Sequence, residues 1–360
     1  MQQSVKKYLF VCLFIMVSFM GLTSAASKKI VIAHRGASGY LPEHSMESKA
    51  MAYAMGVDYI EQDLVMTKDD QLVVLHDHFL DRVTNVASVY PQRKREDGRY
   101  YVIDFTLSEI NALQMTEGFE LKEGQASANF PQRFPIWKSS FKVHTFAQEI
   151  EMIQGLNKST GHHVGIYPEI KSPWFHQHEG KDISRATLLM LKKYGYTSKK
   201  DAVYLQCFDP NEVRRIKTTL QIELGMNVKL VQLIAATQWQ ETMVYENGIA
   251  KPYNYDWMFV PGAMKKIAQY ADGIGPWKPM LVREGSTKDK LIVTHISKEA
   301  QKEGLEVHPY TFRSDEGRIP SYADDFEDLL RIFYCKVGVD GVFTDFPDKA
   351  VSFIRNNSCQ

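Results

Sequence analysis

Eight short runs of apolar, mostly β-branched residues recur from residue 29 onward, and longer helical patterns separate most of them. Alternating strands and helices predict parallel βα units, and eight such units close naturally into a barrel. The expected strands are Lys29–Ala33, Tyr59–Val65, Val164–Ile170, Ala202–Cys207, Val228–Ile234, Ala271–Ile274, Leu305–Pro309 and Gly341–Thr344. The sequence therefore predicts an α/β fold, a (β/α)8 TIM barrel, with an open doubly wound sheet as the alternative.

Amphipathic stretches predict the helices between these strands. They are Met46–Met55, Phe146–Leu156, Ile183–Lys193, Asn211–Thr219, Thr294–Glu303 and Phe326–Val337. Residues from about 79 to 142 and from about 237 to 258 depart from this repeat and are rich in aromatic residues. A loop as long as the first is usually functional or a small subdomain. We expect both stretches to be insertions on top of the barrel, the first being an inserted subdomain after the second strand.

Residues 1–25 have the pattern of a secretory signal peptide. Lys6 and Lys7 precede the apolar run Tyr8–Met20, and small residues around Ala25 offer a cleavage site. The run is short for a transmembrane span, so we expect an exported protein without stable membrane insertion after cleavage. An uncleaved membrane anchor is the alternative.

The charges of the chain balance, with 43 basic and 43 acidic residues, which argues against a nucleic-acid or membrane-surface partner. Beyond Cys12 of the leader, the cysteines are Cys207, Cys335 and Cys359. Because three is odd, at least one is expected to be free or to pair between chains, and the spacing predicts no disulfide framework. No particular oligomeric state is predicted.

The sequence His34-Arg35-Gly36 follows directly after the first expected strand. In a barrel it would lie on the C-terminal face, where catalytic groups collect. Gly36 allows a sharp turn of the backbone. Arg35 offers a planar set of donors that suits phosphate oxygens.

The second expected strand carries two carboxylates on one face. Glu61 and Asp63 point the same way because side chains alternate along a strand, while Ile60 and Leu64 point toward the helices. Two carboxylates inside a barrel would repel each other unless a cation lies between them. A salt-bridged pair is the other interpretation. Ligation by carboxylates alone favours Ca²⁺ or Mg²⁺ over zinc.

Two further segments return to the same place. A hairpin-like turn after the second strand brings His76 back beside Glu61 and Asp63, so His76 and His34 could act as general acid and base. We expect the neighbouring His78 to point elsewhere. At the end of the third strand, Glu169 could complete a metal site and Lys171 could hold a phosphate oxygen.

The motifs His34-Arg35-Gly36, Glu61-Gln62-Asp63 and His76-Asp77 together resemble the signature of the glycerophosphodiester phosphodiesterases. Their flanking residues are similar to the bacterial periplasmic branch, and the resemblance covers residues 29–355. It implies a TIM barrel with an insertion after the second strand, and a periplasmic location, with secretion or surface association as alternatives. It also implies a divalent metal, Ca²⁺ rather than Mg²⁺, bound by Glu61, Asp63 and Glu169.

The resemblance further implies the reaction, which is hydrolysis of small glycerophosphodiesters such as glycerophosphocholine, -ethanolamine and -glycerol to sn-glycerol 3-phosphate and an alcohol. His34 and His76 would transfer protons, and Arg35 and Lys171 would bind the phosphate. We favour His76 as base and His34 as acid, although the sequence leaves the direction open. One departure from the wider family, His44-Ser45, is expected to leave a third imidazole near the mouth.

Other residues are placed by their position after expected strands. Phe208 and Trp277 should lie at the barrel mouth and contact the substrate, although an ordinary hydrophobic rim is an equal alternative. Asp345 is expected to anchor the last loop and not to take part in catalysis. Two other functions remain open: a phospholipase-type enzyme with the same barrel, and a surface binding protein or adhesin that uses the barrel as a scaffold.

Overall fold

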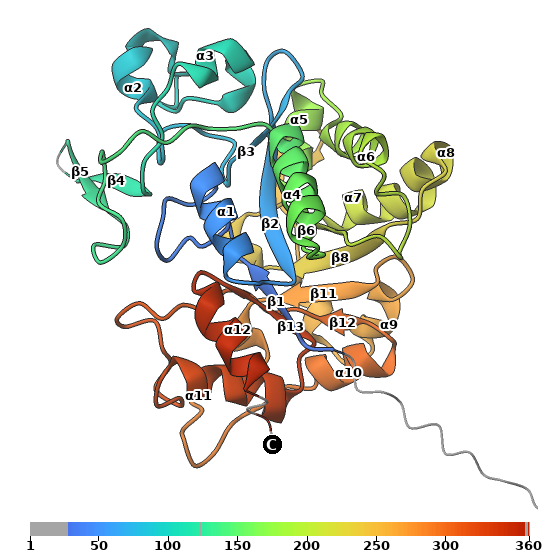
Figure 1. Ribbon diagram of the computed structural model, residues 1–360. Coiled ribbons are helices and arrows are strands. Elements are labelled where there is room, and N and C mark those ends of the chain that lie inside the picture. The colour runs from blue at the N-terminus through green and yellow to red at the C-terminus, as the bar shows by residue number, and fades with distance from the viewer. Residues whose placement is uncertain (1–27, 123, 357–358, 360) are drawn as a thin grey trace, which may run out of the picture.

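The computed structural model describes residues 28–122, 124–356 and 359. Eight parallel strands form one sheet, in the spatial order β12-β11-β8-β7-β6-β2-β1-β13 (Figure 1). Their bounds in chain order are β1 Ile30–Ala33, β2 Tyr59–Met66, β6 Gly165–Ile170, β7 Tyr204–Cys207, β8 Lys229–Ile234, β11 Gly273–Pro276, β12 Glu306–Val307 and β13 Gly341–Thr344. All eight expected strands are confirmed, with ends that differ by a few residues.

The two ends of this sheet are joined by backbone hydrogen bonds. Asp340 N donates to Val307 O at 3.0 Å, and Phe343 N donates to Pro309 O at 3.1 Å. Phe312 N then donates to Phe343 O at 2.8 Å. The chain after β12 therefore runs alongside β13 and closes the sheet. The predicted (β/α)8 barrel is confirmed, and the open doubly wound sheet is excluded.

Helices cover the outside of the barrel (Figure 1). They are α1 Met46–Ala54, α4 Phe146–Thr160, α5 Pro173–His178, α6 Ile183–Lys193, α7 Pro210–Arg215, α8 Gln221–Leu224, α9 Ala263–Ile267, α10 Ile296–Lys302, α11 Phe326–Arg331 and α12 Pro347–Arg355. The π-helical segments η3 Ile216–Leu220 and η7 Ile332–Val337 extend α7 and α11. Thr145 and Gln148 form a capping box at the start of α4, which supplies partners for its first free amide groups. Each helix predicted from amphipathic spacing is present.

The core has two layers because strand side chains alternate. Outward-facing residues such as Ile60 and Leu64 pack against the helices, as predicted. The barrel interior is filled by a second cluster that includes Tyr167, Tyr204 and Phe343. The rings of Tyr167 and Tyr204 stack with centroids 4.8 Å apart. These rings fill the barrel beneath the C-terminal strand ends, so the polar site above them has a packed apolar floor.

The chain between β3 (Leu72–Val74) and α4 forms the large insertion (Figure 1). It contains α2 Val86–Val89, α3 Leu107–Asn111, the short hairpin β4 Phe119–Lys122 and β5 Gln125–Ala128, and the 3-10 turns η1 Pro91–Arg93 and η2 Val102–Asp104. β3 pairs antiparallel with β2, which is the predicted hairpin-like return. The insertion has its own apolar cluster, including Val102, Phe105 and Met115, so it is packed against the barrel.

The second irregular stretch follows β8. It contains η4 Thr237–Trp239, the hairpin β9 Met243–Glu246 and β10 Ile249–Pro252, and η5 Asp256–Phe259. A last 3-10 turn, η6 Lys278–Met280, follows β11. Within the described part of the chain, no helix is long and apolar enough to cross a membrane. The predicted signal peptide lies outside the described residues.

The three cysteines beyond Cys12 form one disulfide bond and leave one free thiol, as an odd number requires. Cys335, in η7, forms a disulfide bond with Cys359. Cys207, at the end of β7, is buried and free. The bond links the last helical layer to the C-terminal end of the chain, a pairing that the spacing alone did not predict.

Candidate active site

A cavity of about 300 Å³ opens at the C-terminal ends of the barrel strands. It is lined by all nine residues that the sequence singled out, which are His34, Arg35, Glu61, Asp63, His76, Glu169, Lys171, Phe208 and Trp277. They come from segments separated by as few as 13 residues, between Asp63 and His76, and by as many as 243, between His34 and Trp277, and the barrel brings them to one face.

The loop after β1 is held in a strained form beside this cavity. Arg35 has φ 57° and Gly36 has φ 90°, both in the left-handed region. A Cβ atom on Gly36 would lie 2.1 Å from Ser48 Oγ, so only glycine fits there. This turn aims the Arg35 amide at the site, where it donates to Glu61 Oε2 at 2.8 Å.

Three buried carboxylates lie together in the cavity. Glu61, Asp63 and Glu169 each offer an oxygen, and these oxygens lie within 4.8 Å of one another. Asp63 is directly paired with Glu169 in the parallel register of β2 and β6. One oxygen of the cluster, Asp63 Oδ1, is buried without a hydrogen-bond partner. Such an arrangement of oxygens could hold a divalent metal ion.

The electrostatics of the three carboxylates support the same interpretation. Burial, together with the charges of Asp63 and Glu169, raises the pKa of Glu61 well above its usual value. Burial and the nearby Asp63 raise the pKa of Glu169 to about 8. Burial also disfavours charge on Asp63, but Lys171 and His44 outweigh it and hold the pKa of Asp63 well below its usual value. A cation among these oxygens would remove the repulsion that raises the first two pKa values.

Each carboxylate is held by a neighbouring side chain. Gln206 Nε2 donates to Glu61 Oε1 at 3.1 Å, and Lys171 Nζ lies 2.8 Å from Glu169 Oε1. His44 Nε2 lies 2.7 Å from Asp63 Oδ2. His44 is completely buried, so the expectation of a third imidazole near the mouth was wrong. The turn before α1 directs this ring inward, where it positions Asp63.

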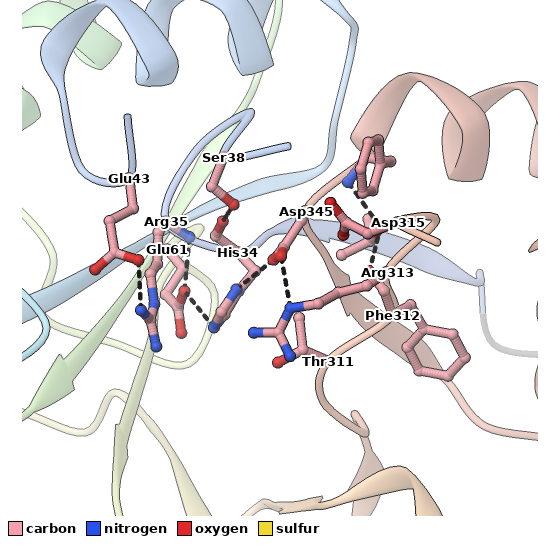
Figure 2. Close-up of polar contacts among 12 residues, drawn as sticks. His34, Arg35, Ser38, Glu43, Glu61, Thr311, Phe312, Arg313, Asp315 and Asp345 are labelled. Atoms are coloured by element: carbon pink, nitrogen blue, oxygen red, sulfur yellow. Dashed lines mark hydrogen bonds and ion pairs between the residues drawn. The ribbon is translucent and has the colours of Figure 1, made fainter. Parts of the chain in front are cut away.

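His34 is fixed by a residue from the far end of the chain. Asp345 Oδ1 lies 2.6 Å from His34 Nδ1, and Asp345 Oδ2 accepts from Arg313 Nε at 2.7 Å (Figure 2). His34 Nε2 points the other way, 3.8 Å from Glu61 Oε2. Burial is the main cause that lowers the pKa of His34, to about 4, and Arg35 adds to it. Asp345 therefore does more than anchor the last loop, since it sets the orientation of the His34 ring.

His76 has a similar arrangement on the opposite segment. Its Nδ1 lies 2.7 Å from Asp77 Oδ1, and its Nε2 lies 3.4 Å from Lys171 Nζ. The ring is 31% exposed and lines the cavity. His78 instead stacks on Phe175 with ring centroids 4.5 Å apart, so it points elsewhere as expected. Alternation is not the cause, because it would put residues 76 and 78 on one face and because both lie beyond the end of β3. Both cavity imidazoles thus have a carboxylate at Nδ1, while Nε2 of His34 faces Glu61 and Nε2 of His76 faces Lys171.

Comparison with known proteins agrees with this geometry. The model of the glycerophosphoryl diester phosphodiesterase family matches residues 34–349. The chain belongs to this family. It is 56% identical to a glycerophosphodiester phosphodiesterase of Haemophilus influenzae over 94% of this chain and 93% of that protein. It is 45% identical to one of Treponema pallidum, over 92% and 94% respectively.

Solved structures share the fold of this family. A putative glycerophosphoryl diester phosphodiesterase from Silicibacter pomeroyi superposes with a TM-score of 0.64 at 21% identity, covering 92% of this chain and 95% of that one. A phosphodiesterase from Oleispira antarctica, solved with the product sn-glycerol-3-phosphate, has a TM-score of 0.57 at 20% identity, covering 91% and 96%. The expectation of an enzyme of the diesterase class is confirmed by the family match and the two bacterial relatives.

Several residues of the cavity in this protein were not predicted from the sequence. They are Gln206, Trp239, Glu241 and Arg313 in the cavity, and Glu43 beside it, which accepts from Arg35 at 2.7 Å. A signal existed for Gln206, because it is a polar residue on a strand whose neighbours are apolar, and it is paired in register with Glu169. Trp239 and Glu241 lie in the stretch predicted as an insertion, where no periodic pattern indicates which side chains turn inward.

Proposed function

We propose that this protein hydrolyses small glycerophosphodiesters, among them glycerophosphocholine, -ethanolamine and -glycerol, to sn-glycerol 3-phosphate and an alcohol, and that it needs a divalent cation to do so. One observation carries the proposal: two imidazoles, each with a carboxylate at Nδ1, line the cavity that holds the buried carboxylate triad. The product bound in the Oleispira antarctica structure is consistent with this reaction.

Glu61, Asp63 and Glu169 would hold the cation. All three residues offer oxygen atoms as ligands, which suits Ca²⁺. Mg²⁺ would fit less well, because it requires a stricter geometry and keeps several waters. When bound, the ion would supply positive charge that stabilises the charge developing on the phosphoryl oxygens.

Arg35 and Lys171 would hold the phosphate. Arg35 Nη1 donates to Glu43 at 2.7 Å, which fixes the guanidinium at the cavity wall. Burial disfavours charge on Lys171, but Glu169 and Asp63 outweigh it and raise its pKa, so the amine stays cationic at neutral pH. Two fixed cations on one side of the cavity would orient the diester for attack.

His34 and His76 would move the protons. In each ring the carboxylate at Nδ1 holds the imidazole and stabilises its charged form, which leaves Nε2 to exchange a proton with the substrate. We assign His76 as the base that takes the proton of the attacking oxygen, which is either water or the glycerol 2-hydroxyl. In the second case a cyclic phosphate forms, and water must open it to give glycerol 3-phosphate. His34 would then donate a proton to the leaving alcohol, which requires the charge of the bound diester to raise its pKa from about 4.

The decisive experiment measures release of glycerol 3-phosphate from glycerophosphocholine. Activity should be lost on dialysis against a chelator and should return when Ca²⁺ is added, more fully than with Mg²⁺. Unchanged activity in excess chelator would contradict the metal requirement. Absence of hydrolysis with every small diester and every divalent ion would refute the proposed reaction itself. Cell fractionation would test the proposed export, which places the mature protein in the periplasm or at the surface.

A further inference from the structure

One wall of the active-site cavity carries neither metal ligands nor imidazoles. It is formed by Trp239 and Glu241, from the stretch after β8, and by Trp277, directly after β11. Phe208, at the end of β7, lies next to them in the same lining. These side chains come from three neighbouring barrel strands, so the fold places them together beside the phosphate-binding residues.

Glu241 differs from the other carboxylates of this cavity because its side chain has no hydrogen-bond or ion-pair partner among the described residues. Glu61, Asp63 and Glu169 each have a hydrogen-bond or ion-pair partner. Within the described ranges, no donor hydrogen-bonds the Glu241 carboxylate and no cationic side chain pairs with it, although its backbone oxygen accepts from Trp174. The charge of Glu241 still reaches the reaction centre, because it contributes to the raised pKa of Lys171 and of Glu169.

The two tryptophans give this wall an aromatic surface. The rings of Trp239 and Trp277 meet edge to face, with centroids 5.1 Å apart and planes at 78°. Trp239 is 37% exposed, so part of its surface is open to a ligand. Tryptophan faces attract cations, and an adjacent carboxylate strengthens the attraction. The hydroxyl of Tyr310, also in the cavity lining, is already used in donating to Ile234 O at 2.7 Å.

We propose that Glu241, Trp239 and Trp277 form a subsite for a positively charged leaving alcohol, that is, for a substituted or primary ammonium head group. The inference rests on the proposed diesterase function and narrows its substrate class. A diester with such a head group is a zwitterion, and the cavity lining offers cationic groups for its phosphate and a carboxylate for its ammonium group. Its phosphate faces Arg35 and Lys171, and its ammonium group faces Glu241. Neutral head groups gain no ionic contact at this wall, and anionic head groups are repelled by it.

If Glu241 has another role, its replacement would have a different effect on activity or metal content. If Glu241 accepts hydrogen bonds from the glycerol hydroxyls, which every substrate shares, its loss would affect all diesters equally. If Glu241 is a fourth metal ligand, its loss would lower the metal content of the protein. The test must therefore compare head groups and measure bound metal.

The first experiment compares kcat/KM for glycerophosphocholine, glycerophosphoethanolamine and the neutral glycerophosphoglycerol in Glu241→Gln. The two cationic substrates should fall by about tenfold and the neutral one by less than about twofold, with bound Ca²⁺ unchanged. Trp239→Leu should reduce use of the cationic substrates in the same selective way. Glu246→Gln, on β9 of the same stretch, is the matched control, because Glu246 is exposed and paired with Lys251 at 2.7 Å. An equal loss for all three diesters, no loss, or a loss of metal would overturn the proposal.

The second experiment does not depend on turnover. Choline alone, titrated into the Ca²⁺-loaded protein in a calorimeter, should bind, and Glu241→Gln should weaken its affinity about tenfold. Choline binding that is absent, or that is the same in both proteins, would refute the subsite. If the wild type hydrolysed no diester but still bound choline through Glu241, the reaction would be wrong and the cation subsite would stand.

Discussion

Asp345 Oδ1 lies 2.6 Å from His34 Nδ1, although the two residues are 311 positions apart in the chain. The other Asp345 oxygen accepts from Arg313 at 2.7 Å (Figure 2). It also accepts from Arg133 at 2.6 Å. Arg133 belongs to the large insertion, whereas Asp345 follows the last strand of the barrel. The insertion and the closing loop therefore both contribute to the position of one predicted proton donor.

Replacing Asp345 by asparagine removes the charge that orients His34 and stabilises its imidazolium form. We expect Asp345→Asn to lower kcat for glycerophosphocholine by about 10²- to 10⁴-fold, with little change in KM. Steady-state kinetics at saturating Ca²⁺ would measure both constants. A variant that keeps near-normal kcat would show that Asp345 only anchors its loop.

Asp315 offers the matched control for that variant. It pairs with Arg133 at 2.8 Å, and Asp345 pairs with the same arginine. Unlike Asp345, Asp315 makes no contact with His34 in the described structure. Asp315→Asn should lower the free energy of unfolding, because it leaves a buried arginine with fewer partners. Its kcat should stay within about threefold of the wild type. Equal losses of kcat in both variants would indicate that disruption of the arginine cluster, and not of His34, is responsible.

His76→Ala removes the proposed base. Turnover should fall by at least about 10²-fold, while bound metal and the melting temperature stay close to the wild type because the ring is partly exposed. His78→Gln is the comparison, since His78 packs on Phe175 outside the cavity lining. It should retain activity and lose stability instead. If His76→Ala kept near-normal turnover with Ca²⁺ present, the proton-transfer scheme would have to be abandoned.

Removing the metal should change how stability depends on pH. The folded pKa of Glu169 is raised from 4.5 to about 8, so its folded form binds a proton more tightly than the unfolded chain does. The stability that this proton contributes is full below pH 4.5 and is lost as pH rises toward about 8. We expect the metal-free protein to lose melting temperature between these pH values, and Ca²⁺ to restore about 5 °C or more at pH 8.

Glu169→Gln isolates this contribution, because glutamine does not titrate. The metal-free variant should show a flatter loss of stability between pH 4.5 and pH 8 than the metal-free wild type. Ca²⁺ should also raise its melting temperature less, since one ligand has lost its charge. Calorimetric scans of both proteins across this pH range would decide. The same pH slope in both would show that other groups dominate.

The disulfide between Cys335 and Cys359 should matter for stability and not for catalysis. It closes a segment with a sequence separation of 24, and cross-linking a loop of that length stabilises by about 3 kcal/mol in the chain-entropy model. Cys335→Ser with Cys359→Ser should lower the denaturant midpoint by a corresponding amount and leave kcat unchanged. Reductant should destabilise the wild type in the same way and have no effect on the double variant. Equal stability of both proteins would contradict this role.

Local periodicity was enough to predict the strands and part of the site. Alternation along β2 separates Glu61 and Asp63 from Ile60 and Leu64, because neighbouring side chains on a strand must face opposite sides. The repeat of apolar runs and helices required parallel strands, and parallel strands place their C-terminal ends on one face. That rule gathered the metal-type carboxylates and His34 at one site, and the hairpin-like return of β3 along β2 brought His76 to them.

The distant residues that hold those groups became visible in the folded barrel alone. Asp345 reaches His34, His44 turns inward to Asp63, and Glu241 enters the cavity from an irregular stretch. The pairing of Cys335 with Cys359 is a further contact of this kind, which the sequence did not predict. These contacts depend on how loops of no fixed period fold over a closed barrel. A strand or helix repeats its own geometry from residue to residue, whereas a loop side chain is placed by packing against parts of the chain that are far away in sequence.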